Sequence, residues 1–396
     1  MSSAALGNSL KHTLTSSHLF APALESQLAT ARANHRGGKT PRSLRGTPTL
    51  KIGHGGTLDP GAAGVVTFGV GRGTKALGLL QKGARKGYDA VVVFGAATDS
   101  FDSFGKVVGR KDASHITRER VEAALEGFRG EVMQRPSVFS ALSRGGERMY
   151  DLARQGKELP ELELRPMFVE ELELVQFWSA GEHEYHWPEA EIERSRKEAF
   201  VKALRFDEIG DVEVVDGADD PPAPPPMAAG KKRKRGQHKR DSEEAEPEAG
   251  TVQQTEQSST PTEKAQRPPC PAPAALIRMT VSSGFYVRSL CHDLGVSLGT
   301  LGMMASLERT RQACFSLAEG NVIPYEEFAA GNEEVWGPKV ARELAAWPKR
   351  EEALLAAAGE KEEKTNEEGE KGGDGTKKSD EDQGGDEKQG GDEKQG

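Results

Sequence analysis

The sequence predicts an α+β fold. Two β-rich runs bounded by glycines, Val65–Val70 and Tyr88–Phe94, favour strands. Apolar residues at helical spacing occur in two other places, after Thr117 and from about Val287. These strands and helices are intermingled without the regular βαβ alternation that a parallel sheet requires, which indicates α+β rather than α/β.

The other elements follow from local signals in chain order. Thr117 is a typical N-cap residue. The helix predicted after it ends near Gly130 and carries four apolar residues on one face: Val121, Ala124, Leu125 and Phe128. Phe168–Trp178, which mixes acidic residues with Val, Leu and aromatics, and the apolar run Ala275–Val281 are predicted as further strands. The helix from about Val287 carries its own stripe: Leu290, Cys291, Leu294 and Leu298.

Two segments are too polar to join this core. Residues Asp207–Ala275 contain PPAPPP, KKRKR and 14 acidic against 9 basic residues. The tail from Glu351 holds 16 acidic and 7 basic residues and thereby the whole net charge of −9. Segments of this composition cannot bury enough apolar surface to order, so we predict disorder in both. The remainder has 37 basic and 32 acidic residues, a charge of +5 that is compatible with RNA binding.

Targeting signals favour the nucleus. Lys231–Arg235 is interpreted as a nuclear localisation signal that binds an import receptor, with a solvated charge cluster as the plain alternative. The N-terminus is Ser-rich and free of acids until Glu25, a pattern shared with mitochondrial presequences, so a mitochondrial or cytoplasmic share stays open. No apolar run is long enough to span a membrane. The three cysteines lack metal-ligand spacing, so we predict free thiols and no metal.

One carboxylate, Asp59, lies on an unusual turn. The segment Lys51–Gly73 surrounds it with glycines, and Pro60 follows it directly. Glycine adopts backbone conformations forbidden to other residues and lets another chain approach closely, whereas proline fixes its own φ. Clusters of Gly, Pro and Asp usually mark ordinary surface turns. The turn by itself therefore supports a functional and a structural interpretation about equally.

A resemblance to a known family favours the functional interpretation. GHGGTLDPGAAGVV, Gly53–Val66, resembles the active-site motif of the TruB-type pseudouridine synthases, which reads roughly G-H-x-G-x-L-D-P-x-A-x-G-V-L. Further blocks match that family in the same order: GRGTK at 71–75, KGYD at 86–89, QRPSVFSAL at 134–142, GERMYDLARQG at 146–156 and SSGFYVRSL at 282–290. The resemblance covers about Lys51 to Thr310 without the polar insert.

The resemblance implies roles for particular residues. Asp59 would be the catalytic nucleophile, and Arg288 the cation that keeps its carboxylate ionised in a water-poor pocket. Tyr88 would stack on the target uracil and serve as, or position, the base that takes the proton. The residues implied to contact RNA or the target base are His54, Lys75, Tyr286, Arg154 and Leu290. The structural alternatives are a turn histidine for His54, core packing for Tyr88 and Tyr286, and solvated cations for Lys75 and Arg154.

The implied function is that of a eukaryotic stand-alone enzyme that isomerises the TΨC-loop uridine of tRNA, position 55, without a cofactor. The implied fold is the pseudouridine-synthase fold, a large mixed but mostly antiparallel sheet flanked by helices. We predict a monomer that binds the T arm of tRNA, and leave mRNA open as a further substrate. Two alternatives remain: a guide-RNA-dependent, dyskerin-like synthase, and a non-catalytic tRNA-binding chaperone of the same fold.

These arguments divide the chain into five parts: a divergent or truncated N-terminal segment 1–50, a first catalytic part 51–206, a disordered insert 207–275, a second catalytic part 276–350 and a disordered acidic tail 351–396. Residues 1–50 lack the strand and the K-P-x-G-x-T-S element with which the family opens. The segment after Trp347 lacks room for a PUA domain, which disfavours the guide-RNA-dependent class.

Overall fold

The structure is a computed structural model, and it describes residues 1–33, 48–81, 84–136, 143–144, 147–148, 163–219 and 270–371. The chain divides into two compact units. The first holds the described residues of Met1–Leu6, Gly56–Thr67 and Ala84–Val322. The second holds those of Gly7–Gly55, Phe68–Gly83 and Ile323–Gly396.

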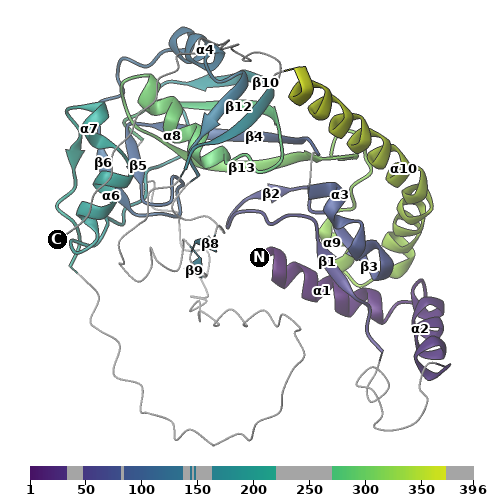
Figure 1. Cartoon of the computed structure of the whole chain (residues 1–396). Helices are drawn as coiled ribbons and strands as arrows, with labels where there is room; N and C mark the ends of the chain where they lie inside the picture. The colour runs from purple at the N-terminus through teal and green to yellow at the C-terminus, as the bar shows by residue number, and fades with distance from the viewer. Residues whose placement is uncertain are drawn as a thin grey trace, which may run out of the picture. The chain divides into compact units, whose positions relative to one another are not determined.

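The first unit is built on a seven-stranded sheet, whose strands β4, β10, β12 and β13 are labelled to the right of helix α8 in the upper part of Figure 1. Its order along the main path is β14-β13-β4-β12-β10-β7, and every neighbour on that path is antiparallel. The seventh strand, β2, pairs with β13 in parallel. The strands are β2 (Ala63–Gly64), β4 (Lys86–Phe94), β7 (Gly130–Gln134), β10 (Arg165–Trp178), β12 (Ala274–Val281), β13 (Gly302–Gln312) and β14 (Phe315–Ser316). The predicted mixed, mostly antiparallel sheet is confirmed.

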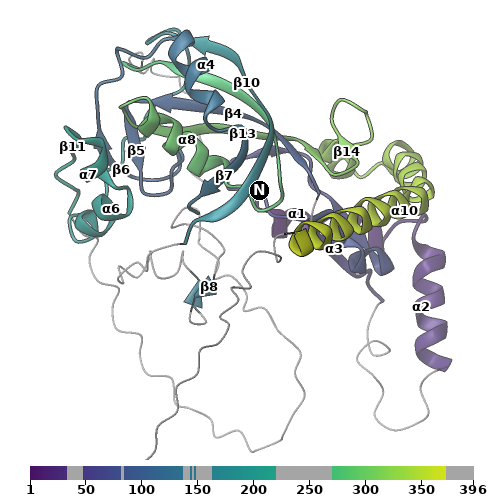
Figure 2. The same ribbon diagram turned by 45° about the horizontal axis from the view of Figure 1, so that its top comes forward.

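Two helices cover this sheet. α8 (Val287–Ser297) packs on β13 and β4, and α4 (Arg118–Glu126) packs on β10 and touches α8 (Figures 1 and 2). Between helices and sheet lies a core of aliphatic side chains such as Val92, Ile277 and Leu294, all fully buried. The three-residue run Val91–Val93 lies in the central strand β4 and is buried on both faces, which explains its unbroken apolar sequence.

A smaller sheet extends the same unit. Its order is β11-β6-β5, and its strands are β5 (Ala96–Thr98), β6 (Val107–Arg110) and β11 (Glu213–Val214). Helices α6 (Lys197–Ala203) and α7 (Phe206–Ile209) belong to the same part of the chain. Phe200, Phe206 and Val108 form a second buried cluster there. The described residues 143–144 and 147–148 form the short pair β8 and β9.

The second unit joins segments from both ends of the chain. Its elements are α1 (Ser3–Thr15, whose first turn belongs to the first unit), α2 (Ala21–Ala33), β1 (Ile52–His54), β3 (Phe68–Val70), the 3₁₀ helix η2 (Gly71–Lys75), α3 (Leu77–Gln81), α9 (Tyr325–Ala329) and α10 (Glu333–Lys371). β1 and β3 form an antiparallel pair. Trp336, 1% exposed, packs with Phe20 and Leu50 in the core of this unit.

Most predicted elements are confirmed. The helix after Thr117 begins where expected, and the Thr117 side chain accepts a hydrogen bond from the backbone N–H of Arg120. The helix from Val287 and the strands at Tyr88–Phe94, Phe168–Trp178 and Ala275–Val281 are also present. The single strand predicted for Val65–Val70 is wrong. Val65 is 1% exposed outside any strand, so its apolar character reflects burial alone, and the run divides between the two units.

The structure corrects several boundaries of the predicted parts. The insert, predicted as 207–275, begins and ends inside folded elements: α7 and β11 precede residue 220, and Cys270 is 3% exposed in the main core. The many acidic residues of this segment make its composition polar overall, although apolar residues such as Val215 pack in the second cluster. The expected tail from 351 is helical as far as Lys371, because Ala, Leu, Glu and Lys favour helix. Ile323 onward belongs to the second unit rather than to the second catalytic part. The N-terminal segment contains two helices in its described residues.

Gly64 in β2 is expected to tolerate no side chain. Its φ is +100°, and a Cβ added there would lie 2.3 Å from the backbone oxygen of Arg309 on the neighbouring strand. We expect Gly64→Ala to lower the free energy of unfolding by ~3 kcal/mol or more, because both strain and a backbone clash must be relieved. Thermal unfolding followed by circular dichroism measures the loss.

Gly71→Ala is the matched control for this prediction. Gly71 also has a positive φ, +58°, but nothing lies within 4 Å of an added Cβ. This variant isolates the backbone strain, which costs about 1 kcal/mol. If the two variants melted at the same temperature, the close approach of β2 to β13 would contribute nothing to the loss of stability, contrary to our expectation.

Candidate active site

Asp59 begins a tight turn in the first unit. The backbone N–H of Ala62 donates to the Asp59 carbonyl at 3.1 Å, with Pro60 and Gly61 between them. Gly61 has a φ of +76°. Proline at the second position and a glycine of positive φ at the third are the signature of a type II turn. The turn holds the Asp59 side chain partly in solvent, with 33% of it exposed.

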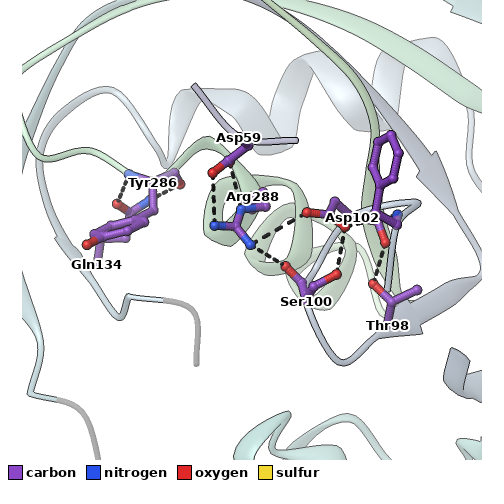
Figure 3. Close-up of polar contacts among 8 residues, drawn as sticks. Asp59, Thr98, Ser100, Asp102, Gln134, Tyr286 and Arg288 are labelled. Carbon is purple, nitrogen blue, oxygen red and sulfur yellow. Dashed lines mark hydrogen bonds and ion pairs between the residues drawn. The ribbon is translucent and has the colours of Figure 1, made fainter. Parts of the chain in front are cut away.

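Arg288, on α8, binds the Asp59 carboxylate with two donors. Its Nε lies 2.8 Å from Oδ2 of Asp59, and its Nη2 donates to Oδ1 at 3.2 Å (Figure 3). The Arg288 side chain is only 9% exposed, so the pair is sheltered from water on the arginine side. This two-point contact fixes the direction as well as the charge of the carboxylate.

A second carboxylate supports Arg288 from the other side. Nη1 of Arg288 donates to the Ser100 carbonyl at 3.0 Å and lies 3.5 Å from Oδ2 of Asp102 (Figure 3). Asp102 in turn accepts from the Ser100 hydroxyl at 2.6 Å and from the Phe104 backbone N–H at 3.0 Å. Burial raises the pKa of the Asp102 carboxyl above its ordinary value, while these donors and Arg288 oppose that shift.

The start of α8 is fixed by a side chain from β7. Gln134 donates its amide to the Tyr286 carbonyl at 2.9 Å and accepts from the Tyr286 N–H at 2.8 Å (Figure 3). Tyr286 is the N-cap residue of α8 and makes no side-chain capping bond. A cation in the first turn of a helix is unfavourable because the helix N-terminus carries partial positive charge. The carboxylates of Asp59 and Asp102 offset that cost at Arg288.

Tyr88 is close enough to Asp59 for the carboxylate charge to affect the pKa of its phenol. It is buried in the main core on β4, with 7% exposed, and its hydroxyl is hydrogen-bonded to Arg309. Burial raises the pKa of the Tyr88 phenol, Arg309 opposes that effect, and the Asp59 charge raises the pKa further. The ring therefore packs in the core while its hydroxyl belongs to the charged site.

Arg309 connects Tyr88 to the loop that carries Asp59. Its Nε donates to the Val65 carbonyl at 2.7 Å, and its Nη2 donates to the Gly56 carbonyl at 3.3 Å. Its backbone oxygen also accepts from the Val65 N–H at 2.8 Å. Arg309 is 1% exposed. One buried arginine on β13 thus holds both ends of the Asp59 loop.

The structure brings together three of the residues predicted from the sequence: Asp59, Arg288 and Tyr88. Tyr286 is half-buried at the start of α8. Leu290, for which an RNA contact is predicted, is a core residue in this structure. Leu290 is 1% exposed in the main core, because the face of α8 that carries Leu290 and Leu294 packs on the sheet.

Two further residues with predicted contacts, His54 and Lys75, belong to the second unit. His54 ends β1, its ring lies edge-on to Phe68, and its buried Nδ1 has no hydrogen-bond partner among the described residues. Lys75 is exposed at the end of η2. Arg154 and the basic run Lys231–Arg235 lie outside the described residues.

Sequence reasoning missed Asp102 and Arg309. Asp102 follows the buried strand β5 by a few residues. The sequence signal that could have indicated Asp102 was a group of polar residues directly after a buried strand. Arg309 had no such signal, since an arginine in a strand usually points to solvent.

The arrangement suits covalent or electrostatic catalysis by a carboxylate. Asp59 is exposed enough to meet a substrate, its orientation is fixed by Arg288, and a phenol lies nearby. Among the residues that the structure describes, no group of three or more His, Cys, Asp or Glu side chains is placed to hold a metal ion. The helices in the described ranges include none with the length and apolar character needed to cross a membrane.

One family model and two yeast relatives identify the family of this chain. The family described as "TruB family pseudouridylate synthase (N terminal domain)" matches residues 43–196. The tRNA pseudouridine synthase 4 of Schizosaccharomyces pombe is 36% identical over 84% of this chain and 80% of its own length. The protein of the same name from Saccharomyces cerevisiae is 30% identical over 85% of this chain and 80% of its own length. A crystal structure of a Cbf5–Nop10–Gar1 complex matches at 19% identity over 69% of this chain and 43% of that one, with a TM-score of 0.33.

Proposed function

The chain belongs to the TruB family of pseudouridine synthases, and from that membership we propose that it converts the TΨC-loop uridine of tRNA, position 55, into pseudouridine with Asp59 as the nucleophile. Its relatives from two yeasts are named as tRNA pseudouridine synthases, which makes tRNA the substrate class. The proposal goes beyond family membership in two respects, the position in the T loop and the role of Asp59.

One observation carries the role of Asp59: its partly exposed carboxylate is held by two donors of Arg288, 2.8 and 3.2 Å away. The reaction breaks the bond between N1 of uracil and C1′ of ribose and forms a bond between C5 and C1′. The carboxylate attacks the sugar or stabilises the positive charge that develops on it. C5 loses its proton and N1 gains one, so the product is an isomer and no cofactor is consumed.

Tyr88 and Arg288 take complementary parts in this proposal. Arg288 keeps Asp59 ionised when RNA displaces water from the site, because a fixed cation opposes the effect of desolvation. Tyr88, through its hydroxyl, takes, or positions the group that takes, the proton from C5. The target base is stacked inside a folded loop, so it must be flipped out to reach Asp59.

Contacts to the rest of the RNA complete the proposal. His54 and Tyr286 contact the flipped nucleotide, and Lys75 and Arg154 bind backbone phosphates. Charged side chains of this kind position RNA without reading its sequence. Each of these contacts is expected to contribute to binding rather than to chemistry.

A guide-free assay tests the proposal. Purified protein is incubated with a tRNA transcript and with an isolated T-arm hairpin, and pseudouridine is mapped in both RNAs. We expect one pseudouridine at the T-loop uridine in each RNA, with no guide RNA or further protein present. Modification that required a guide RNA would favour the dyskerin-like class. Binding without any modification would favour the chaperone.

A further inference from the structure

One aromatic side chain beside the Asp59 turn is mostly exposed to solvent. Phe104 is 67% exposed, the highest fraction after Met1 among the large apolar side chains in the described part of the chain. Single exposed apolar residues are common and need no explanation by themselves. The surroundings of Phe104 distinguish it from such residues.

The Phe104 ring lies against the turn that carries Asp59. A Cβ added to Gly61 would fall 2.1 Å from Cζ of Phe104, so the ring occupies the space that any larger residue at 61 would need. Gly61 is two residues after Asp59, and the Asp59 carbonyl closes the same turn. The exposed aromatic ring therefore borders the turn that carries the proposed nucleophile.

The loop that carries Phe104 is held rigidly. Residues 99–106, here named the Phe104 loop, are tied to one another and to β13 by hydrogen bonds. The Phe104 N–H donates to Asp102, the Ser103 N–H donates to Met304 at 2.9 Å, and the Lys106 N–H donates to Asp99 at 2.8 Å. A ring on such a loop pays little conformational entropy when it binds a ligand.

The same loop also supports the charged site. Asp102 lies 3.5 Å from Arg288 through one carboxylate oxygen and holds the Phe104 N–H through the other. A single carboxylate thus ties the backbone of Phe104 to the Asp59–Arg288 pair. A flat apolar surface in that place is suited to a flat apolar ligand.

We propose that Phe104 is a stacking site for a nucleobase of the RNA that flanks the target uridine. This inference rests on the proposed function. When the target uridine leaves the stack of its loop, a neighbouring base loses a stacking partner, and an exposed phenyl ring replaces it without regard to base identity. Stacking of one base on an aromatic side chain changes affinity by about 5- to 150-fold.

Kinetics with two Phe104 variants and a matched control test the proposal. Phe104→Leu keeps an apolar side chain over Gly61 but loses the aromatic face, whereas Phe104→Tyr keeps the face. On a T-arm hairpin we expect Phe104→Leu to raise KM at least fivefold with kcat within about twofold of the wild type, and Phe104→Tyr to match the wild type. Phe168→Leu, at a 46% exposed phenylalanine on β10, is the control and should leave KM unchanged.

Fluorescence reports the contact directly. 2-Aminopurine replaces, in separate hairpins, the nucleotide on the 5′ or the 3′ side of the target uridine. Binding to wild-type protein should quench one of the two probes by stacking, and Phe104→Leu should lose most of that quenching. Circular dichroism melting should show Phe104→Leu as stable as the wild type, because the ring is mostly exposed.

Several outcomes would overturn the inference. Unchanged KM and unchanged quenching in Phe104→Leu would do so, as would a lower kcat at constant KM, which would make Phe104 a positioning residue of its loop. An equal KM increase in Phe168→Leu would show that the effect is not specific. If the wild type formed no pseudouridine, the proposed function would fail, and the probe titration would still decide whether Phe104 stacks on RNA.

Discussion

Asp59→Asn is expected to abolish pseudouridine formation while the protein still binds tRNA. Asparagine has nearly the shape of aspartate, and its amide oxygen can still accept a hydrogen bond from Arg288. It has no negative charge and is a poor nucleophile, so neither attack on the sugar nor stabilisation of positive charge remains. Loss of a nucleophile typically lowers kcat by at least about 10⁴-fold. Product mapping under single-turnover conditions measures the loss.

Binding and stability distinguish this result from misfolding. We expect the tRNA dissociation constant of Asp59→Asn to stay within about threefold of the wild type, and its melting temperature to change little. Asp112→Asn is the matched control, because Asp112 is an exposed carboxylate in the same unit, 74% exposed, on a loop after β6. It should retain full activity. Undiminished product from Asp59→Asn would refute the assignment of the nucleophile.

Arg288→Gln is expected to cause the second largest loss, and to reduce both activity and stability. The substitution removes the charge that faces Asp59 at 2.8 Å and Asp102 at 3.5 Å. Loss of one preorganised electrostatic contact in an active site costs about 10²- to 10³-fold in kcat. Asp102, with its side chain 7% exposed, would be left as a buried carboxylate without its cation, which costs about 3 kcal/mol of stability.

The pH dependence of that stability loss identifies its cause. Burial already raises the pKa of Asp102 in the folded protein, and removal of Arg288 raises the pKa further. A carboxyl with a raised folded-state pKa costs no stability below its unfolded-state pKa. Its cost grows as pH rises from the unfolded-state pKa towards the folded-state pKa, and it is complete above that. We expect the melting temperature deficit of Arg288→Gln to be smaller at pH 5 than at pH 8. An equal deficit at both pH values would point to lost packing instead. Arg288→Lys keeps the charge and should fall between the two proteins.

Local signals were enough to predict most of the first unit. The N-cap at Thr117, the apolar stripe from Leu290 to Leu298 and the unbroken apolar run in β4 each depend on neighbours in sequence, and each element formed where expected. α4 ends at Glu126, a few residues before the predicted stop at Gly130, because Gly127 already closes the last turn. The mostly antiparallel sheet followed from the absence of βαβ alternation and from the family resemblance.

Contacts between distant segments were harder to predict. The pairing of Asp59 with Arg288 joins residues 229 positions apart, and only the family resemblance indicated it. Arg309 binds the Val65 carbonyl across 244 positions, and neither its burial nor its bond to Tyr88 has a signature in the local sequence. The division into two units was also missed, because Trp336 and Phe20 meet from opposite ends of the chain. Tail residues 351–371 were judged by charge alone, whereas helix formation depends equally on Ala and Leu.

The order of strands in the main sheet has a consequence for synthesis on the ribosome. β4 lies between β12 and β13, and both of these strands begin beyond residue 270. While the nascent chain is shorter than that, the largely buried strand β4 has unpaired backbone groups on both edges. Such strands associate readily with other chains, and sheets closed by distant segments fold slowly. We therefore expect β4 to need protection by a chaperone until the last quarter of the chain has emerged.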